Sequence, residues 1–162
     1  MFRHVSRIGL VAAVFAASVV IDARLLFAQA NAADALIGNW RMDRAKSVFT
    51  GAVPEWRTMK FEKVANNVRH TTETMQGEVV YKLTYTFQVD GKDYPADVQM
   101  SVSTLSFKRI DANTLERTGK YQGMLTETVT YTLSDGGKTL TAVQKLAANA
   151  DQINSTQVFT KQ

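Results

Sequence analysis

The segment at residues 79–89 is the feature that most constrains how this chain can fold. Every second residue in it is apolar and those between are nearly all polar; the apolar set is Val79, Tyr81, Leu83, Tyr85, Phe87 and Val89. A β-strand sends successive side chains to opposite faces, so the pattern predicts a strand with one apolar and one wet face. Asp90 and Gly91 follow directly and are typical of a hairpin turn.

Most of the chain beyond residue 55 repeats this alternation between short turn-forming segments. We expect nine strands there, at residues 56–64, 68–75, 79–89, 96–102, 104–110, 114–121, 124–133, 140–147 and 152–160. Residues 36–46 are expected to form a short strand followed by a helical turn. Because nearly every connection is short, the strands form a meander, which closes naturally into a barrel. The predicted fold is all-β, an antiparallel up-and-down barrel of about 8–10 strands, with a sandwich as the alternative.

The first 32 residues have the composition of a signal peptide. Two arginines precede an apolar stretch at residues 8–21, and small residues downstream fit cleavage after Ala30 or Ala32. The alternative is a membrane anchor, but the stretch is shorter than the roughly 20 residues that a spanning helix needs. We therefore expect residues 1–32 to be removed and residues 33–162 to form one domain. That domain would be periplasmic or secreted, with no stable membrane insertion after cleavage.

Composition narrows the possible partners of this domain. The chain has no cysteine, which excludes disulfides and cysteine-ligated metals. The full chain carries a formal net charge of +4, but the predicted signal peptide contains three basic residues and one acidic residue. The remaining 16 basic and 14 acidic residues give about +2, which offers no reason to propose nucleic acid as a partner.

No pattern of residues indicates catalysis, a cofactor or a metal site. His70 is the only histidine of the predicted domain and lies in a polar strand, so we expect it at the surface or the barrel rim. The alternative is a barrel enzyme with His70 as base, which requires His70 to face inward beside an acid. Glu116 and Glu127 are expected to be solvated or paired across strands, because their neighbours are Arg117 and threonines.

Gly38-Asn39-Trp40, followed by a meander of strands, resembles the start of the lipocalin-like (calycin) β-barrels. Together with the segments at residues 90–95 and 107–114, it is similar to small exported bacterial lipocalin-like proteins of unknown function. The resemblance implies structural roles for Gly38 and Trp40, with the tryptophan plugging one end of the barrel. Lipocalins also have an arginine late in the chain that packs over this tryptophan, and the last strand here offers only Lys161.

The resemblance also implies a monomeric cup for a small hydrophobic or amphipathic molecule. A barrel of this strand number can leave its interior partly unfilled. If the alternation holds, candidate ligand-binding residues on the inward face are Tyr81, Tyr85, Phe87, Met100 and Phe107. The alternative is that these residues form a packed core. A filled barrel would instead act as a protein-interaction or inhibitor module in the cell envelope.

Overall fold

The computed structural model describes residues 34–98, 102–149 and 152–162. The predicted signal peptide and Met100 lie outside these residues. Ten strands form one antiparallel sheet: β1 (Gly38–Phe49), β2 (Trp56–Val64), β3 (Asn67–Gln76), β4 (Val79–Phe87), β5 (Tyr94–Val98), β6 (Val102–Arg109), β7 (Thr114–Tyr121), β8 (Met124–Ser134), β9 (Thr139–Leu146) and β10 (Ser155–Lys161). The predicted all-β fold and strand number are confirmed.

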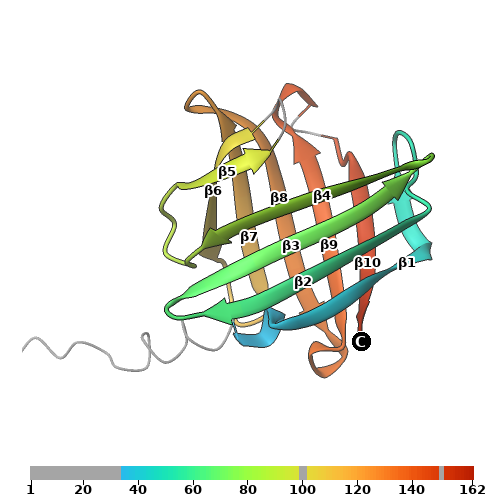
Figure 1. Ribbon diagram of the computed structural model, residues 1–162, viewed down its shortest axis with the longest axis horizontal. Helices are drawn as coiled ribbons and strands as arrows, with labels where there is room; N and C mark the ends of the chain where they lie inside the picture. Colours follow the sequence, from blue (N-terminus) through green and yellow to red (C-terminus); the bar gives the residue numbers. More distant parts are fainter. Residues whose placement is uncertain (1–33, 99–101, 150–151) are drawn as a thin grey trace, which may run out of the picture.

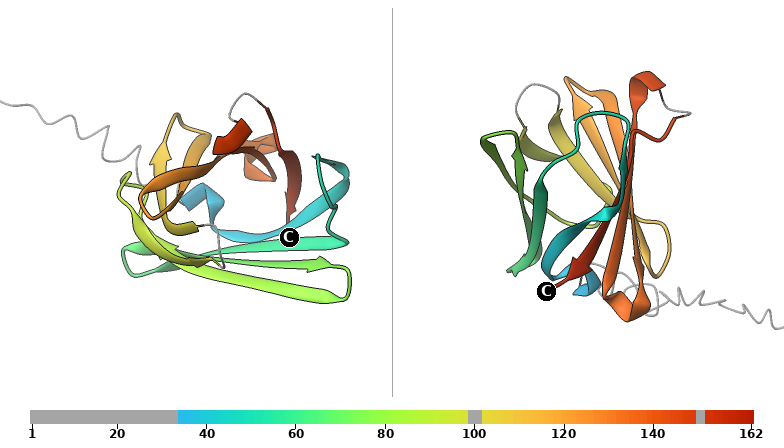
Figure 2. Two further views of the ribbon diagram at one scale, coloured as in Figure 1. Left: turned by 90° about the horizontal axis from the view of Figure 1, so that it is seen from above. Right: turned by 90° about the vertical axis from the view of Figure 1, so that its right-hand side faces the viewer.

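The first and last strands pair with each other, and this pairing makes the sheet a barrel. The strand order is β4-β3-β2-β1-β10-β9-β8-β7-β6-β5, with β1 hydrogen-bonded to β10 (Figures 1 and 2). Within the described residues, β4 and β5 end the sheet and no ladder joins them. The connection between them is tied to β6 by a hydrogen bond from the Gly91 amide to the Phe107 carbonyl, 2.8 Å long. The result is a nearly closed up-and-down barrel.

The predicted helical turn within residues 36–46 is wrong, because β1 runs unbroken for 12 residues. Its residues pair with β2 on one side and with β10 on the other, with an irregularity between Asp43 and Val48. The pairing with β2 ends at Arg41, so it is the pairing with β10, through Asp43, that outweighs the local helical preference of this segment. Only residues 34–36, which precede β1, are helical here.

The hairpin connections alternate between the two ends of the barrel. The turns β2–β3, β6–β7 and β8–β9 lie at one end, toward the bottom of Figure 1. The helical turn at residues 34–36 and the C-terminus lie at the same end. We call this the closed end. The connections β1–β2, β3–β4, β7–β8 and β9–β10 lie at the other, which we call the open end.

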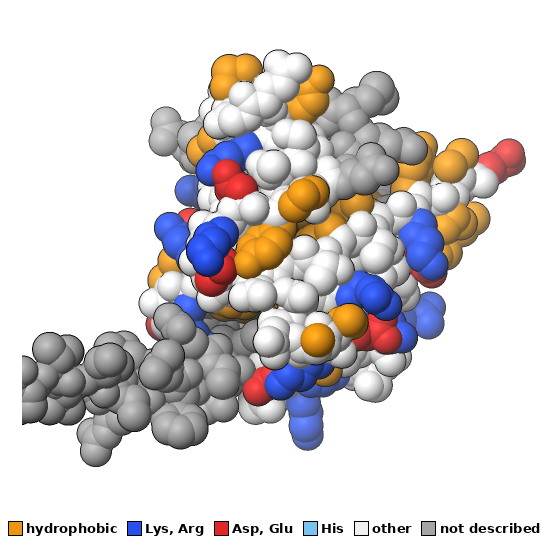
Figure 3. Space-filling model, turned by 60° about the vertical axis from the view of Figure 1, so that its left-hand side comes forward, with side chains coloured by type: hydrophobic (Ala, Val, Ile, Leu, Met, Phe, Trp, Pro, Cys, Tyr) orange, Lys and Arg blue, Asp and Glu red, His pale blue; other side chains and the backbone are white. Residues whose placement is uncertain are grey.

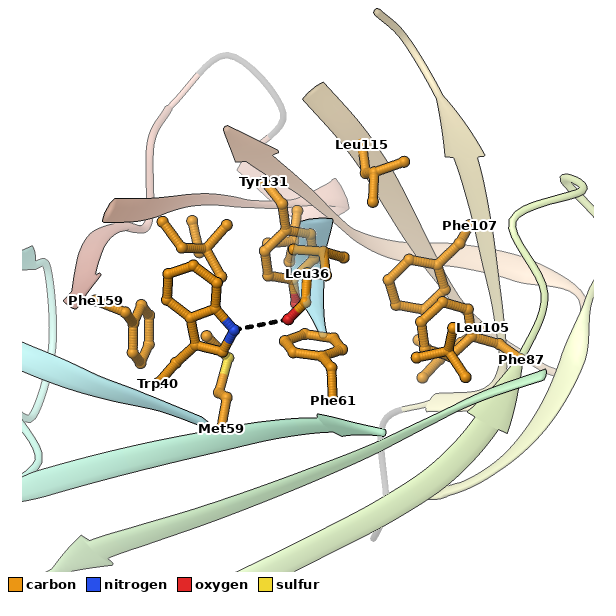
Figure 4. Close-up of a cluster of buried hydrophobic side chains, with 14 of the residues drawn as sticks. Leu36, Trp40, Met59, Phe61, Phe87, Leu105, Phe107, Leu115, Tyr131 and Phe159 are labelled. Atoms are coloured by element: carbon orange, nitrogen blue, oxygen red, sulfur yellow. Dashed lines mark hydrogen bonds between the residues drawn. The ribbon is translucent and has the colours of Figure 1, made fainter. Parts of the chain in front are cut away.

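A packed hydrophobic core fills the closed end (Figure 4). Its fully buried large apolar side chains are Leu36, Trp40, Phe61, Phe87, Leu105, Phe107, Leu140 and Phe159. Phe87 and Phe107 stack with their ring centroids 3.7 Å apart. The sequence left open whether the inward-facing aromatic residues line a pocket or form a packed core. Phe87 and Phe107 belong to the packed core.

Trp40 and Lys161 cover this end of the barrel. The indole Nε1 donates a 2.8 Å hydrogen bond to the Leu36 carbonyl, and Lys161 Nζ lies 5.3 Å from the centre of the indole ring. Lys161 therefore makes a cation–π contact with Trp40. Gly38 leaves room for it: a Cβ there would lie 2.6 Å from Lys161 Cε, and the φ angle of +139° also favours glycine.

Candidate ligand-binding cavity

The open half of the barrel contains a cavity of about 970 Å³. Its lining comes from both sides of the barrel, β2, β3 and β4 facing β7, β8, β9 and β10. Apolar lining residues include Met59, Leu83, Val129, Ala142 and Phe159. The volume is that of pockets that enclose small organic molecules. The barrel interior is thus packed with side chains at its closed end and contains a cavity at its open end.

Polar side chains joined by hydrogen bonds surround this cavity, and we call them the polar belt. Its members are Arg57, Thr72, Thr74, Gln144, Ser155, Gln157, Glu127, Arg117, Tyr85 and His70. On one side, Arg57 Nε donates to Thr74 Oγ1 at 2.9 Å and Nη1 donates to Gln157 Oε1 at 2.5 Å. Gln157 Nε2 donates to Ser155 Oγ at 3.0 Å. These contacts link β3, β2 and β10.

The belt continues through β9 to a buried ion pair between β7 and β8. Ser155 Oγ donates to Gln144 Oε1 at 3.3 Å, and Gln144 Nε2 donates to Glu127 Oε2 at 2.5 Å. Glu127 Oε1 accepts from Arg117 Nη2. The side chains of Arg117 and Glu127 are only 11% and 13% exposed. The predicted cross-strand pairing of Glu127 is confirmed, but it lies inside the barrel, whereas Glu116 pairs with Lys108 outside.

Gly119 makes this ion pair possible. A Cβ at Gly119 would lie 2.8 Å from Glu127 Cγ and 3.2 Å from Glu127 Oε1. The Glu127 side chain therefore lies across the bare backbone of β7 to reach Arg117. Burial alone would lower the pKa of Arg117, but the hydroxyls of Tyr131 and Tyr85 and the Glu127 carboxylate raise it above its ordinary value. Arg117 thus stays charged and paired.

Tyr85, His70 and Thr72 complete the belt. The Tyr85 hydroxyl lies 2.6 Å from His70 Nδ1, and His70 Nε2 lies 3.0 Å from Thr72 Oγ1. Neutral His70 has one donor and one acceptor nitrogen, and a hydroxyl can either donate or accept, so both ring nitrogens are satisfied. Burial, and next the charge of Arg117, lower the pKa of His70 from 6.5 to about 3.

The prediction that His70 faces solvent or the rim is wrong. Its side chain is 2% exposed and its ring stacks on Phe61 with centroids 4.2 Å apart. It shares the inward phase of Val68, so it points into the barrel although its neighbours in sequence are polar. Its hydrogen-bonding partners are hydroxyls and not a carboxylate, so the arrangement required by the enzyme alternative is not formed.

Among the residues that the structure describes, Arg57 differs from Arg117 in having only neutral hydrogen-bonding partners. It lines the cavity, and its two side-chain acceptors are Thr74 and Gln157. Burial lowers the pKa of Arg57, yet an arginine starts high enough to keep its charge at neutral pH. With Arg117 and Glu127 cancelling, the belt carries one uncompensated positive charge.

The structure places the predicted ligand-binding residues at different depths. Tyr81 lines the cavity near its mouth and is 53% exposed. Tyr85 is buried in the belt behind His70, and Phe87 and Phe107 lie in the packed core at the closed end. Met100 lies outside the described residues.

The sequence interpretation missed the polar belt, although the alternation contained its signal. Arg57 is in phase with Met59 and Phe61 along β2, and Gln157 is in phase with Phe159 along β10. Arg117 and Glu127 likewise continue the inward rows of β7 and β8. A polar residue in the apolar phase of a strand indicates a buried polar interior.

The residues that the structure describes contain no group of three or more histidine, aspartate or glutamate side chains placed to hold a metal ion. None of the described helices has the length and apolar character needed to span a bilayer.

Comparison with known proteins supports the fold. No protein-family model and no curated protein sequence matches this chain. Solved structures do: a fatty acid transporter, REP1-NXSQ (13% identity, TM-score 0.55, covering 78% of this chain and 96% of that one), and a Schistosoma mansoni fatty acid binding protein in complex with arachidonic acid (10%, 0.56, 81% and 98%). A zebrafish ileal bile acid-binding protein complexed with cholic acid is similar too (12%, 0.54, 79% and 99%). These similarities confirm the up-and-down β-barrel fold, and the closer likeness to exported bacterial lipocalin-like proteins stays a prediction.

Proposed function

We propose that this protein binds a small amphipathic molecule with a negatively charged group in the open half of its barrel. The observation that carries the proposal is the cavity of about 970 Å³ in which Arg57 faces only neutral partners. Apolar lining accommodates a hydrocarbon body, and an uncompensated guanidinium attracts a carboxylate or a similar anion.

Several features support binding over the alternatives. The cavity argues against a filled barrel that acts only through its outer surface. The lack of a carboxylate beside His70 argues against the enzyme in which it would be the base. Arachidonic acid and cholic acid, the ligands of two structural neighbours, each combine an apolar body with a carboxyl group.

Arg57→Met tests the role of the charge. The probes are oleate and oleyl alcohol, which share a hydrocarbon chain and differ in charge, and binding is measured by titration calorimetry. We expect the variant to bind oleate about tenfold more weakly or worse, because a desolvated charge-assisted contact is lost. Its affinity for the alcohol should change little.

Arg69→Met is the matched control, because Arg69 is exposed on β3 outside the cavity lining. It should bind both probes as the unmodified protein does. Equal oleate affinity for Arg57→Met and Arg69→Met would contradict the role of Arg57. If the unmodified protein binds neither oleate nor oleyl alcohol, the proposed function itself is contradicted.

We also propose that the chain is exported, because its first 32 residues have the composition of a signal peptide. Intact-mass measurement on protein recovered from the periplasmic and culture fractions should show a chain that begins at Asn31 or Ala33. An uncleaved chain confined to the cytosol or the membrane fraction would contradict export.

A further inference from the structure

The exposed large apolar side chains gather at the open end of the barrel. Among the described residues they are Val48, Val53, Val79, Val80, Tyr81, Tyr121, Met124, Leu125, Leu146 and Ile153 at that end, with Ile110 the exception at the closed end. Figure 3 shows hydrophobic side chains at the top of the molecule and at its upper right. We call the ten side chains at the open end the apolar rim.

The apolar rim carries few charges, and they nearly balance. Lys82 pairs with Glu73 and Lys120 pairs with Asp93. The other charged residues of the described connections at this end are acidic at positions 55 and 78 and basic at position 145. No cluster of one sign accompanies the exposed apolar side chains, so the rim has no electrostatic preference for an anionic surface.

We propose that the apolar rim docks this protein reversibly on a lipid bilayer with neutral, zwitterionic headgroups. The rim side chains come from four separate connections around the cavity mouth and from the strand ends beside them. Each can enter a fluid interface separately, and the near-balanced charge matches zwitterionic headgroups. Tyr81 and Tyr121 add aromatic rings with a polar tip, which suit that interface.

Docking in this orientation places the cavity mouth against the bilayer. Gln76, Val79 and Val80 at the β3–β4 hairpin line the cavity, and the two valines also belong to the apolar rim. An amphipathic ligand could then move between bilayer and cavity without crossing water. That consequence rests on the proposed function, whereas docking itself does not require a ligand.

The test compares substitutions at the two ends of the barrel. Met124 and Ile153 are 66% and 51% exposed on the apolar rim, and neither lines the cavity. Ile110 is 53% exposed at the closed end and is the matched control. Protein purified from cells that express the full chain, without added ligand, is sedimented with phosphatidylcholine vesicles at low and high salt.

We expect the unmodified protein and Ile110→Gln to cosediment equally, with no loss at high salt. The double variant Met124→Gln/Ile153→Gln should bind about tenfold more weakly or worse, because two apolar side chains no longer enter the interface. Thermal unfolding checks that both variants remain folded. If the double variant is unfolded, the single variants Met124→Gln and Ile153→Gln are compared with Ile110→Gln instead.

Several results would overturn this inference. The inference is wrong if the unmodified protein stays in the supernatant, or if it binds only vesicles that contain anionic lipid and is released from them at high salt. It is also wrong if the protein associates through this end with another protein and not with vesicles. Equal retention of the double variant and the unmodified protein would also overturn it. Oleate titration without vesicles separates the two proposals. If the unmodified protein does not bind oleate but does cosediment with vesicles, the proposed function is contradicted and membrane docking is not.

Discussion

At the scale of single residues, the burial of His70 has a cost that depends on pH. The ring is enclosed by Phe61 and hydrogen-bonded to Tyr85 and Thr72, and all three contacts suit the neutral form. Protonation would place a second positive charge near Arg117 at a buried position. The folded barrel therefore holds His70 neutral at pH values where an unfolded chain protonates it.

His70 should make the free energy of unfolding fall as the pH is lowered. Its pKa is about 3 in the folded protein against 6.5 ordinarily, so the unfolded chain binds one more proton between these values. Stability is then lost as the pH falls from about 6.5 toward about 3, by up to about 5 kcal/mol from this residue.

Urea unfolding of the unmodified protein and of His70→Gln at several pH values measures this effect. Groups shared by both proteins cancel in the difference, so the advantage of the unmodified protein should shrink with falling pH. A difference that stays constant with pH would contradict the assignment of neutral His70.

At the scale of elements, the β7–β8 hairpin determines what the cavity can offer a ligand. Arg117 and Glu127 face each other across it, and Gly119 lets the glutamate side chain lie against β7. This pairing neutralises one of the two belt arginines. Arg57 on β2 has only Thr74 and Gln157 as side-chain hydrogen-bonding partners among the described residues, and so keeps its charge available.

Gly119→Ala should destabilise the protein by about 1–3 kcal/mol, because the new Cβ overlaps Glu127 Cγ and strains a tightly packed pair. Gly51→Ala is the control, since nothing lies within 4 Å of a Cβ there. Chemical denaturation of both variants measures the difference. Equal stabilities would show that Glu127 moves aside at no cost.

The strands themselves were largely predictable from alternation. The ranges 56–64 and 114–121 coincide with β2 and β7, and the predicted inward positions of Tyr85 and Phe87 along β4 agree with their burial. The error at β1 arose because its second half has little alternation of its own. Pairing with β10 holds this half extended, and local sequence does not identify that partner.

At the scale of the whole molecule, the two ends of the barrel have different roles. The closed end is filled by aromatic side chains and covered by Trp40 and Lys161. The open end contains the cavity, the polar belt and the apolar rim. Stability and binding are thus separated along one barrel, which explains how the aromatic stripe of β4 contributes to both core and pocket.

The sequence by itself determined the strand class, the hairpin order and the residues that face inward, because these depend on a two-residue period and on local turns. Only the tertiary structure decided what the inward residues become. The contacts of Phe87 with Phe107 and of Arg57 with Gln157 depend on which strands approach one another after β1 joins β10. They join strands that are not neighbours in the sheet, and no periodicity along a single strand records them.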